Sequence, residues 1–244
     1  MKVKVLSYNI HGCVNSRRQI DVKTISKIIG SIKADIIALQ EVDTEKPISK
    51  NINQAKTISA YLGMDYLYFP VEKTGRHAFG LAIFFRYPVV NTNIFLLPNL
   101  YRRLKMRKRG VIRITLHTLK GNIHIINTHL SVYKLERYFQ LISVLGWNNL
   151  SNLSLEEPVI FCGDLNANPT SLIYRKLSRY LIDIQRKAYH TVKPKPTFPS
   201  KFPIFRIDHI LVSNHFRIIN AEVVKNELTL KASDHLPVVA DLRL

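Results

Sequence analysis

PVIFCGDLNANP, residues 158–169, joins an unbroken apolar run to a cluster of polar residues. Apolar residues without alternation are typical of a strand covered on both faces, and Gly163 permits a tight turn or the close approach of a ligand. We therefore predict a buried strand that presents Asp164 and Asn166 on one face at its end. The carboxylate can activate a water or bind a hard cation, and the amide can donate to a phosphate oxygen. The same residues also form ordinary turns, so this stretch alone leaves catalysis and turn formation open.

Length and composition favour one folded domain. The 244 residues, 46% of them hydrophobic, suit a single large α/β or all-β domain, which we expect to span residues 1–244. No apolar run approaches the ~20 residues of a membrane helix, and the N-terminus lacks the apolar segment of a secretory signal. Two cysteines, Cys13 and Cys162, are too few for a disulfide framework. We expect a cytoplasmic protein with reduced thiols and no obligate protein partner.

The basic composition indicates polyanionic partners. Lys and Arg number 36 against 17 Asp and Glu, a formal net charge of +19. Nucleic acid is the first candidate, an anionic membrane surface the second, and a basic protein whose charge only aids solubility the third. The densest basic segment, residues 101–110, either grips a phosphate backbone or forms a solvated loop, because Leu104 and Met106 interrupt it. The candidate substrate-binding residues are Arg102, Arg103, Arg107 and Arg109 in this segment, with Arg76 and His77 as weaker candidates for the rim.

Hydrophobic periodicity predicts alternating helices and strands. Apolar residues at helical spacing predict helices over residues 21–32 (capped by Asp21), 53–62 (ended by Gly63), 136–150 and 172–181. Short apolar runs predict strands over residues 2–8, 34–42, 66–70, 79–90, 111–119, 123–127, 158–162, 206–212 and after Pro237. The strands over residues 79–90 and 111–119 are expected to be neighbours, and residues 120–122 to form a hairpin turn. Four prolines predict an extended loop over residues 193–203.

Polar residues capable of chemistry lie beside the predicted strands, mostly at their ends. Two stacked sheets would bring such ends to one edge, where acidic groups bind Mg²⁺ or Mn²⁺ and histidines meet an anionic substrate. This inventory fits hydrolysis of a phosphate ester. Serine-nucleophile and zinc chemistry fit less well, because a G-x-S-x-G elbow, a glycine-rich phosphate loop and closely spaced His and Cys ligands are absent from the sequence. The six sites are Asn9, Glu41, His129, Asp164 with Asn166, Asp208, and Asp234 with His235.

The ordered motifs SYN (7–9), LQEV (39–42), NTHL (127–130), GDLN (163–166), RIDH (206–209) and SDHLP (233–237) resemble the endonuclease/exonuclease/phosphatase superfamily. The resemblance covers nearly the whole chain. It implies an α/β (α+β) fold, a four-layer αββα sandwich of two packed mixed β-sheets flanked by helices, with one divalent-metal site for Mg²⁺ or Mn²⁺.

The resemblance also implies residue roles. Glu41 would be the main metal ligand, supported by Asn9 and Asp234. Asp164 would orient and activate the attacking water, and Asn166 and His235 would contact the scissile phosphate. Asp208 would orient and charge His235. His129 looks like a second phosphate contact, although a histidine satisfied within the fold at a strand end is the alternative.

Substrate class is less defined than chemistry. The THL form of residues 128–130 differs from the tyrosine-bearing segment of exonuclease III-like abasic-site enzymes, and is more similar to sphingomyelinase-like and tyrosyl-DNA phosphodiesterase-like members. We expect an Mg²⁺-dependent phosphodiesterase acting on nucleic acid. A phospholipid or inositol-phosphate headgroup is the alternative substrate, and a non-enzymatic polyanion-binding protein is the third hypothesis. A lipid enzyme would need exposed apolar residues, for which Phe198, Phe202 and Phe205 are the obvious candidates, and these could equally stack on unpaired bases.

Overall fold

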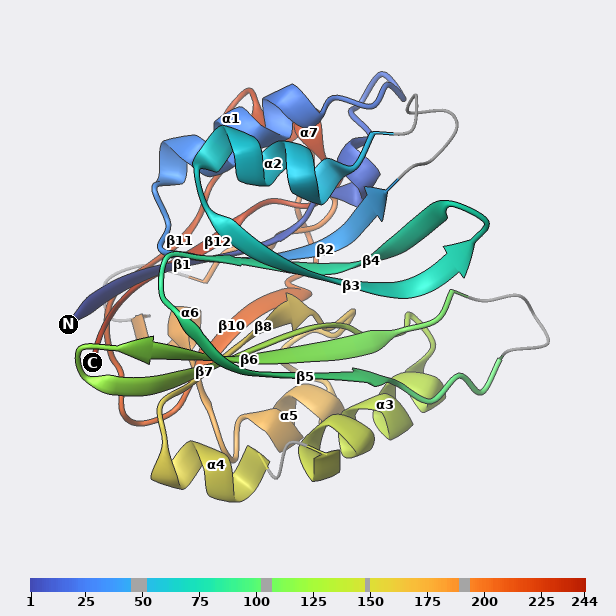
Figure 1. The fold of residues 1–244 in the computed structure, drawn as a ribbon. Helices are drawn as coiled ribbons and strands as arrows, with labels where there is room; N and C mark the ends of the chain where they lie inside the picture. The colour runs from blue at the N-terminus through green and yellow to red at the C-terminus, as the bar shows by residue number, and fades with distance from the viewer. Residues whose placement is uncertain (45–51, 102–106, 148–149, 189–193) are drawn as a thin grey trace.

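Two six-stranded β-sheets stack face to face in the computed structural model, and helices cover both outer faces (Figure 1). The structure describes residues 1–44, 52–101, 107–147, 150–188 and 194–244. The layering confirms the predicted four-layer αββα sandwich of two mixed sheets.

Each sheet contains one pair of parallel neighbours, β1 with β2 and β7 with β8. The first sheet, in spatial order, consists of β11 (Arg217–Val223), β12 (Val238–Arg243), β1 (Lys2–Asn9), β2 (Ile36–Thr44), β4 (His77–Phe85) and β3 (Asp65–Thr74). The second consists of β5 (Val89–Leu96), β6 (Gly110–Thr118), β7 (Gly121–His129), β8 (Val159–Asp164), β10 (Asp208–Val212) and β9 (Ile182–Asp183).

The helices follow the predicted capping signals where those exist. The Asp21 carboxylate accepts the Thr24 backbone N–H at 2.9 Å, and Gly63 ends its helix with φ of 59°. The first sheet is covered by α1 (Val22–Ile32), α2 (Gln54–Leu62) and α7 (Thr229–Ala232), and the second by α3 (Lys134–Trp147), α4 (Leu150–Glu156) and α5 (Leu172–Leu177) (Figure 1). Two short helices complete the described elements, a 3₁₀ turn η1 (His11–Cys13) and α6 (Ile184–Lys187).

Apolar side chains fill three layers. Those of the inner faces, such as Ile83 and Ile125, form the core between the sheets. Ile25 is part of the cluster beneath the upper helices, and Phe161 is part of the cluster above the lower ones. Every residue of β8 is buried, which confirms the prediction of a strand covered on both faces.

Several predicted boundaries are wrong. The strand predicted over residues 79–90 ends at Phe85, after which the chain crosses to the other sheet as β5. It is therefore not a neighbour of residues 111–119, because β4 pairs with β2 and β3 whereas β6 pairs with β5 and β7. Hydrophobicity reports burial but not which sheet a strand joins. The helix predicted over residues 172–181 ends at Leu177, and α3 begins two residues before the predicted start.

Strands β9 and β11 were missed by the sequence analysis. β9 is only two residues long, and most residues of β11 are exposed or half-buried, so neither has a strong apolar signal. None of the described helices is both long enough and apolar enough to span a bilayer.

Candidate active site

Strand pairing explains why the predicted site residues meet. β7 and β8 are parallel and place His129 opposite Asp164, whereas β10 runs antiparallel to β8 and places Asp208 opposite the same Asp164. His129, Asp164 and Asp208 therefore form one row across three adjacent strands. In the other sheet, β1 ends at Asn9, whose carbonyl accepts the Ser233 hydroxyl at 2.8 Å. This contact holds the residues that precede β12 at the same edge.

Gly163 allows the row to form. A Cβ atom at this position would lie 2.2 Å from the Thr128 carbonyl oxygen of the neighbouring strand. Any side chain would force β7 and β8 apart next to Asp164. Glycine is therefore required here for the close approach of two backbones, and this keeps His129 and Asp164 in register.

A line of charged groups runs from Asp208 through His235 to Asp164. His235 Nδ1 donates to Asp208 at 2.9 Å, and its Nε2 lies 3.7 Å from Asp164 Oδ2. Burial lowers the pKa of His235, but the Asp208 and Asp164 carboxylates outweigh burial and raise it to about 10. Burial and the nearby Asp208 charge raise the pKa of Asp164 to about 7, against the opposing effect of His235. The Thr197 hydroxyl donates to Asp208 at 2.5 Å and fixes its orientation.

His129 is held as a neutral imidazole. Its Nδ1 lies 2.9 Å from a guanidinium nitrogen of Arg109, and because a guanidinium can only donate, Nδ1 accepts. The remaining hydrogen is therefore on Nε2, which lies 3.4 Å from Asp164 Oδ2. Burial, and then the Arg109 charge, holds the pKa of His129 well below its ordinary value. Asn166 completes this side of the site, since its Nδ2 donates to the Leu130 carbonyl at 2.9 Å.

Glu41 reaches the site through a β-bulge. The pairing of β2 with β4 slips between Leu39 and Val42, and Glu41 within the slip has a φ of 56°. A bulge of this kind redirects one side chain out of the normal alternation, and a non-glycine residue at positive φ is strained. The Glu41 carboxylate accepts from Asn9 Nδ2 at 3.3 Å and remains 27% exposed. The bulge therefore directs a partly open carboxylate toward the row of buried groups.

Asn9 bridges the two sheets. Its Nδ2 donates to Glu41 at 3.3 Å and to Asp164 at 3.0 Å, and its Oδ1 accepts the His11 backbone N–H at 3.0 Å. The amide oxygen is thus used within the fold, so Asn9 supports the carboxylates as a hydrogen-bond donor.

His11 is a site residue that the sequence analysis missed. Its Nδ1 lies 2.7 Å from Asp234 Oδ1. The hydrogen bond that His11 donates to Asp234 raises the pKa of His11. Burial alone would raise the pKa of Asp234, but this bond and the charges of His235 and His11 together outweigh burial and lower it. Its position two residues after Asn9, at a predicted strand end, is the signal that would have identified it.

The residues matched to the superfamily motifs thus meet at one edge. Comparison with known proteins identifies the family of the chain. The model of the endonuclease/exonuclease/phosphatase family matches residues 6–235. The chain belongs to this family. Members of the family are hydrolases of phosphate esters.

Individual relatives are distant. The uncharacterized protein YbhP of Escherichia coli K12 is 27% identical over 99% of this chain and 96% of its own length. A putative neutral sphingomyelinase of Drosophila melanogaster is 26% identical, and the match covers all of this chain but 61% of the fly protein. A solved endonuclease/exonuclease/phosphatase structure from Beutenbergia cavernae superposes with a TM-score of 0.79 at 21% identity, over 100% of this chain and 72% of that one, and it supports the fold.

The carboxylates of this family member suit a divalent cation. One atom each of Asp164, Asp208 and His235 lies within 4.8 Å of the others. His235, however, donates to Asp208 and its raised pKa keeps it protonated at neutral pH, and a protonated imidazole binds no metal. Hard cations prefer carboxylate oxygens, which Asp164, Glu41 and Asp234 provide. Burial is the main cause of the raised pKa of Asp164 and the Asp208 charge adds to it, so a divalent cation beside Glu41 would favour the ionised carboxylate.

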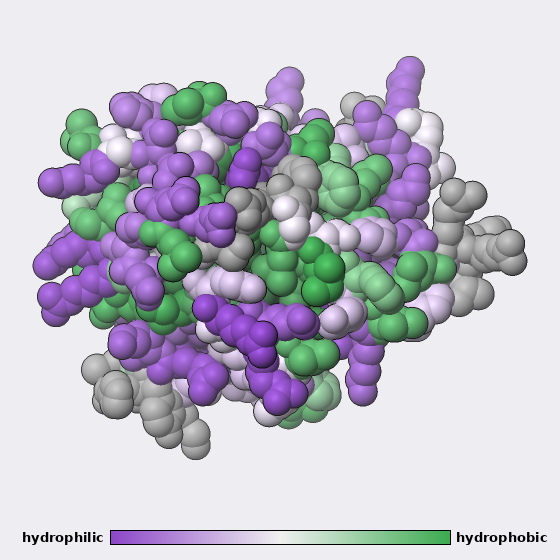
Figure 2. Space-filling model, turned by 90° about the horizontal axis from the view of Figure 1, so that it is seen from below, coloured by the Kyte–Doolittle hydropathy of each residue, from purple (hydrophilic) through white to green (hydrophobic). Residues whose placement is uncertain are grey.

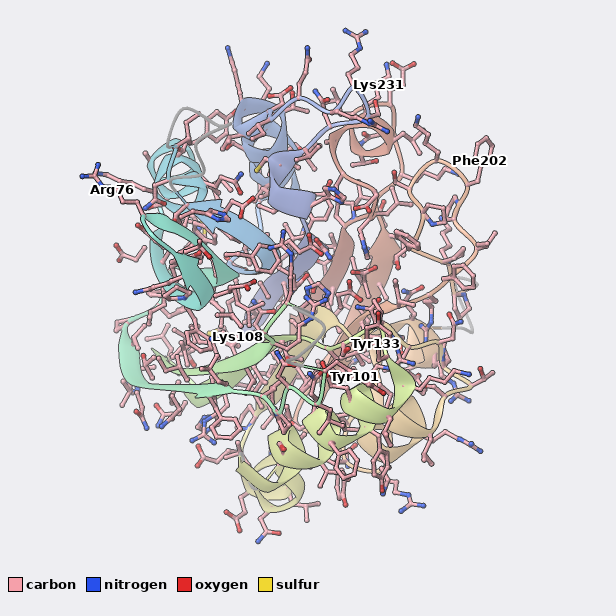
Figure 3. All side chains as sticks on the ribbon, turned by 90° about the vertical axis from the view of Figure 1, so that its right-hand side faces the viewer. Arg76, Tyr101, Lys108, Tyr133, Phe202 and Lys231 are labelled. Atoms are coloured by element: carbon pink, nitrogen blue, oxygen red, sulfur yellow. The ribbon has the colours of Figure 1, made fainter. Side chains whose placement is uncertain are left out.

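The predicted substrate-binding residues are scattered, except for Arg109. Arg76 lies at the exposed β3–β4 turn and points away from the site, and His77 contacts Asp43 at 2.8 Å (Figure 3). The Arg107 guanidinium lies 4.1 Å from the centre of the Phe79 ring. Arg102 and Arg103 lie outside the described residues. Arg109 lies in the site through its contact with His129, and substrate contact by all six residues stays a prediction.

Proposed function

We propose that this chain hydrolyses phosphodiester bonds with the help of Mg²⁺ or Mn²⁺. The observation that carries the proposal is the row of His129, Asp164 and Asp208 with His235 beside it, in which one carboxylate lies between a neutral and a protonated imidazole. Such a row places a proton acceptor next to two hydrogen-bond donors, as in-line attack on a phosphate requires.

Each group has a role in this proposal. Glu41 and Asp234 would hold the cation, and Asn9 would keep the carboxylates in place. A bound divalent cation supplies charge stabilisation to the phosphate oxygens. Asp164, whose pKa is about 7, takes the proton of the attacking water near neutral pH.

The imidazoles bind the phosphate. Protonated His235, held by Asp208, and the Nε2–H of His129, held by Arg109, donate to phosphate oxygens on which negative charge develops. Asn166 adds a third polar group next to His129. These donors are fixed in advance by buried partners, so little reorganisation is needed during the reaction.

Two substrate classes remain, each with its own support. The net charge of +19 favours nucleic acid. Exposed apolar side chains favour a phospholipid headgroup, because Phe202 is 80% and Ile204 70% exposed in the loop whose Phe198 packs on His235. The printed name of the fly relative, a putative neutral sphingomyelinase, adds support for the second class.

Substitution of Glu41 tests the metal role. Glu41→Gln keeps the size of the side chain but removes its charge, and we expect turnover of bis(4-nitrophenyl) phosphate in Mg²⁺ to fall at least ~10²-fold. Glu222→Gln on β11, away from the site, is the matched control and is expected to keep its turnover. Normal turnover by Glu41→Gln would contradict the proposed metal site.

A further inference from the structure

The outward face of α3 is apolar where a helix of a globular protein is normally polar. Leu135, Phe139 and Ile142 follow one another at intervals of four and three residues, so they lie on one side of the helix. They are 57%, 45% and 39% exposed, whereas the opposite side packs into the core through Leu141 and Val144. Figure 2, which views the molecule from the side of the lower helices, shows hydrophobic side chains gathered on this surface.

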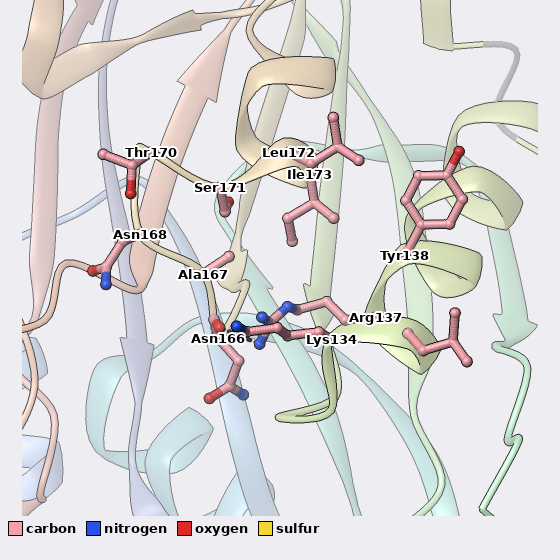
Figure 4. A pocket seen from close by; sticks show the side chains of 11 residues that line it. Lys134, Arg137, Tyr138, Asn166, Ala167, Asn168, Thr170, Ser171, Leu172 and Ile173 are labelled. Carbon is pink, nitrogen blue, oxygen red and sulfur yellow. Dashed lines mark hydrogen bonds between the residues drawn. The ribbon is translucent and has the colours of Figure 1, made fainter.

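This face continues into a groove that ends at the candidate active site. The groove, of about 680 Å³, lies between α3 and α5, and Leu135, Tyr138 and Leu172 form part of its apolar wall (Figure 4). Asn166 lines the same groove. Leu172 itself is 53% exposed, and Val132, just before α3, is 54% exposed. We call Val132, Leu135, Phe139, Ile142 and Leu172 the α3 surface.

The exposed charges that α3 and α5 themselves carry are of one sign. The single acidic residue of α3, Glu136, is buried and accepts the backbone N–H groups of Leu100 and Tyr101 at 3.0 and 3.2 Å. The six residues of α5 include no acid. Exposed Lys134 and Arg175 lie on these helices. The result is an apolar patch bordered by cations on a protein of net charge +19.

We propose that the α3 surface docks on an anionic phospholipid bilayer. Leucine, isoleucine and phenylalanine gain free energy in the acyl region, and the bordering cations gain it from anionic headgroups. Phe139 is the one aromatic residue among the five of the α3 surface, so the surface lacks the row of aromatic rings on which successive bases stack, and this argues against nucleic acid as the occupant. A second copy of this chain would carry the same positive charge.

Docking gives the groove a substrate. A bilayer against the α3 surface brings headgroup phosphodiesters to the end of the groove at Asn166, and the groove walls take the first apolar part of the lipid. This last step rests on the proposed phosphodiesterase function. Docking itself does not, because vesicle binding is measured without turnover.

Paired substitutions test the docking surface. Phe139→Gln with Ile142→Gln removes two apolar side chains without changing charge and keeps good helix formers. The matched control, Val90→Thr with Ile94→Thr, removes two side chains that are 60% and 53% exposed on β5 and keeps a good strand former. Co-sedimentation is measured with vesicles of phosphatidylglycerol and phosphatidylcholine in equal parts, with vesicles of phosphatidylcholine alone, and with single-stranded DNA. Thermal melting checks that each variant is folded.

We expect the wild type and the β5 variant to bind the anionic vesicles equally well and the α3 variant to bind about tenfold more weakly, from the apolar area removed. Binding to phosphatidylcholine alone should be weaker for all three. Equal binding of the α3 variant and the wild type to anionic vesicles, or no binding by the wild type, overturns the proposal. So does a loss of DNA binding in the α3 variant with vesicle binding intact, which would assign the surface to nucleic acid.

Discussion

Asp164 and Asp183 are both buried carboxylates of the second sheet, on strands that flank β10, and their environments are opposite. Asp183 faces the Arg206 guanidinium at 2.6 Å and accepts the Tyr174 hydroxyl at 2.7 Å. Burial alone would raise its pKa, but contacts with His209 and Arg206 outweigh burial and lower it. Burial, and then the charge of the neighbouring Asp208 carboxylate, raise the pKa of Asp164 to about 7.

Both carboxylates are buried, so their partners, and not burial, decide that Asp183 stabilises the fold whereas Asp164 is suited to catalysis. Asp183 receives a full positive charge and also caps α6 through the backbone N–H groups of Gln185 and Arg186. Asp164 accepts hydrogen bonds from the Asn9 side chain and the Asn166 backbone N–H, and its one cationic neighbour, His235, is also paired with Asp208. The charge of Asp183 is matched by a full positive charge, whereas the charge of Asp164 gains by binding a cation or taking up a proton. Arg206 pairs with Asp183, whereas Asp208, two residues later, pairs with His235 beside Asp164.

Removing the Asp164 charge should give the largest effect of these substitutions. We expect it to lower turnover without lowering stability. Asp164→Asn removes the proton acceptor, and we expect kcat to fall by about 10³-fold, within the usual range for a general base. The melting temperature should hold or rise, because the repulsion with Asp208 disappears. A variant that unfolds instead of losing kcat would place Asp164 with Asp183 as a structural residue.

Removing the Asp183 charge should mainly lower stability. Asp183→Asn leaves Arg206 buried without its partner, which typically costs about 3–5 kcal/mol of unfolding free energy. Urea unfolding at pH 7 measures this cost. Asp241→Asn is the control, since its pair with Lys4 at 3.5 Å is only partly buried, with side chains 37% (Lys4) and 31% (Asp241) exposed, and should contribute less than about 1 kcal/mol. A loss for Asp183→Asn no larger than for the control would remove the contrast.

Asp208→Asn should lower kcat by about 10²-fold at neutral pH, because His235 loses the carboxylate that keeps it protonated and oriented. Thr197→Val, which removes only the hydroxyl that orients Asp208, should have a smaller effect in the same assay. If Thr197→Val lost as much kcat as Asp208→Asn, the Asp208 charge would not be the cause.

Acid should remove the stabilising effect of Asp183. Because the folded state lowers the pKa of this carboxyl, its contribution to stability is present above the unfolded pKa of about 3.9 and is lost as pH falls below that value toward the folded pKa. The difference in unfolding free energy between the wild type and Asp183→Asn should therefore shrink from pH 5 downward. A difference that grows on acidification would have the wrong sign.

Much of the site could be predicted from sequence because strand ends are readable. The apolar run before Asp164 and the order of the motifs placed His129, Asp164 and Asp208 at one edge, and strand pairing brings them together. Glu41 was identified, but its bulge was not, since a register slip depends on the partner strand. Arg109 was predicted only as one of several basic residues, because a run of like charges does not reveal which side chain turns inward.

Two features outside the site could not be predicted from the sequence, because they depend on how the elements pack in three dimensions. The apolar spacing over residues 136–150 predicted a helix with one buried side, and α3 does pack on the sheet through Leu141. Its additional apolar residues, Phe139 and Ile142, lie on the outward face, and only the structure reveals that no described element covers them. Crossing from one sheet to the other after Phe85 is likewise a property of the whole fold.

The most direct test of the central claim is the initial rate of bis(4-nitrophenyl) phosphate hydrolysis by the wild-type protein in Mg²⁺, before and after addition of excess chelator and after Mg²⁺ is restored. The proposed cation ligands Glu41 and Asp234 predict turnover that stops with chelator and returns with Mg²⁺. Undiminished turnover in chelator, or none under any of these conditions, would contradict a divalent-metal phosphodiesterase at this site.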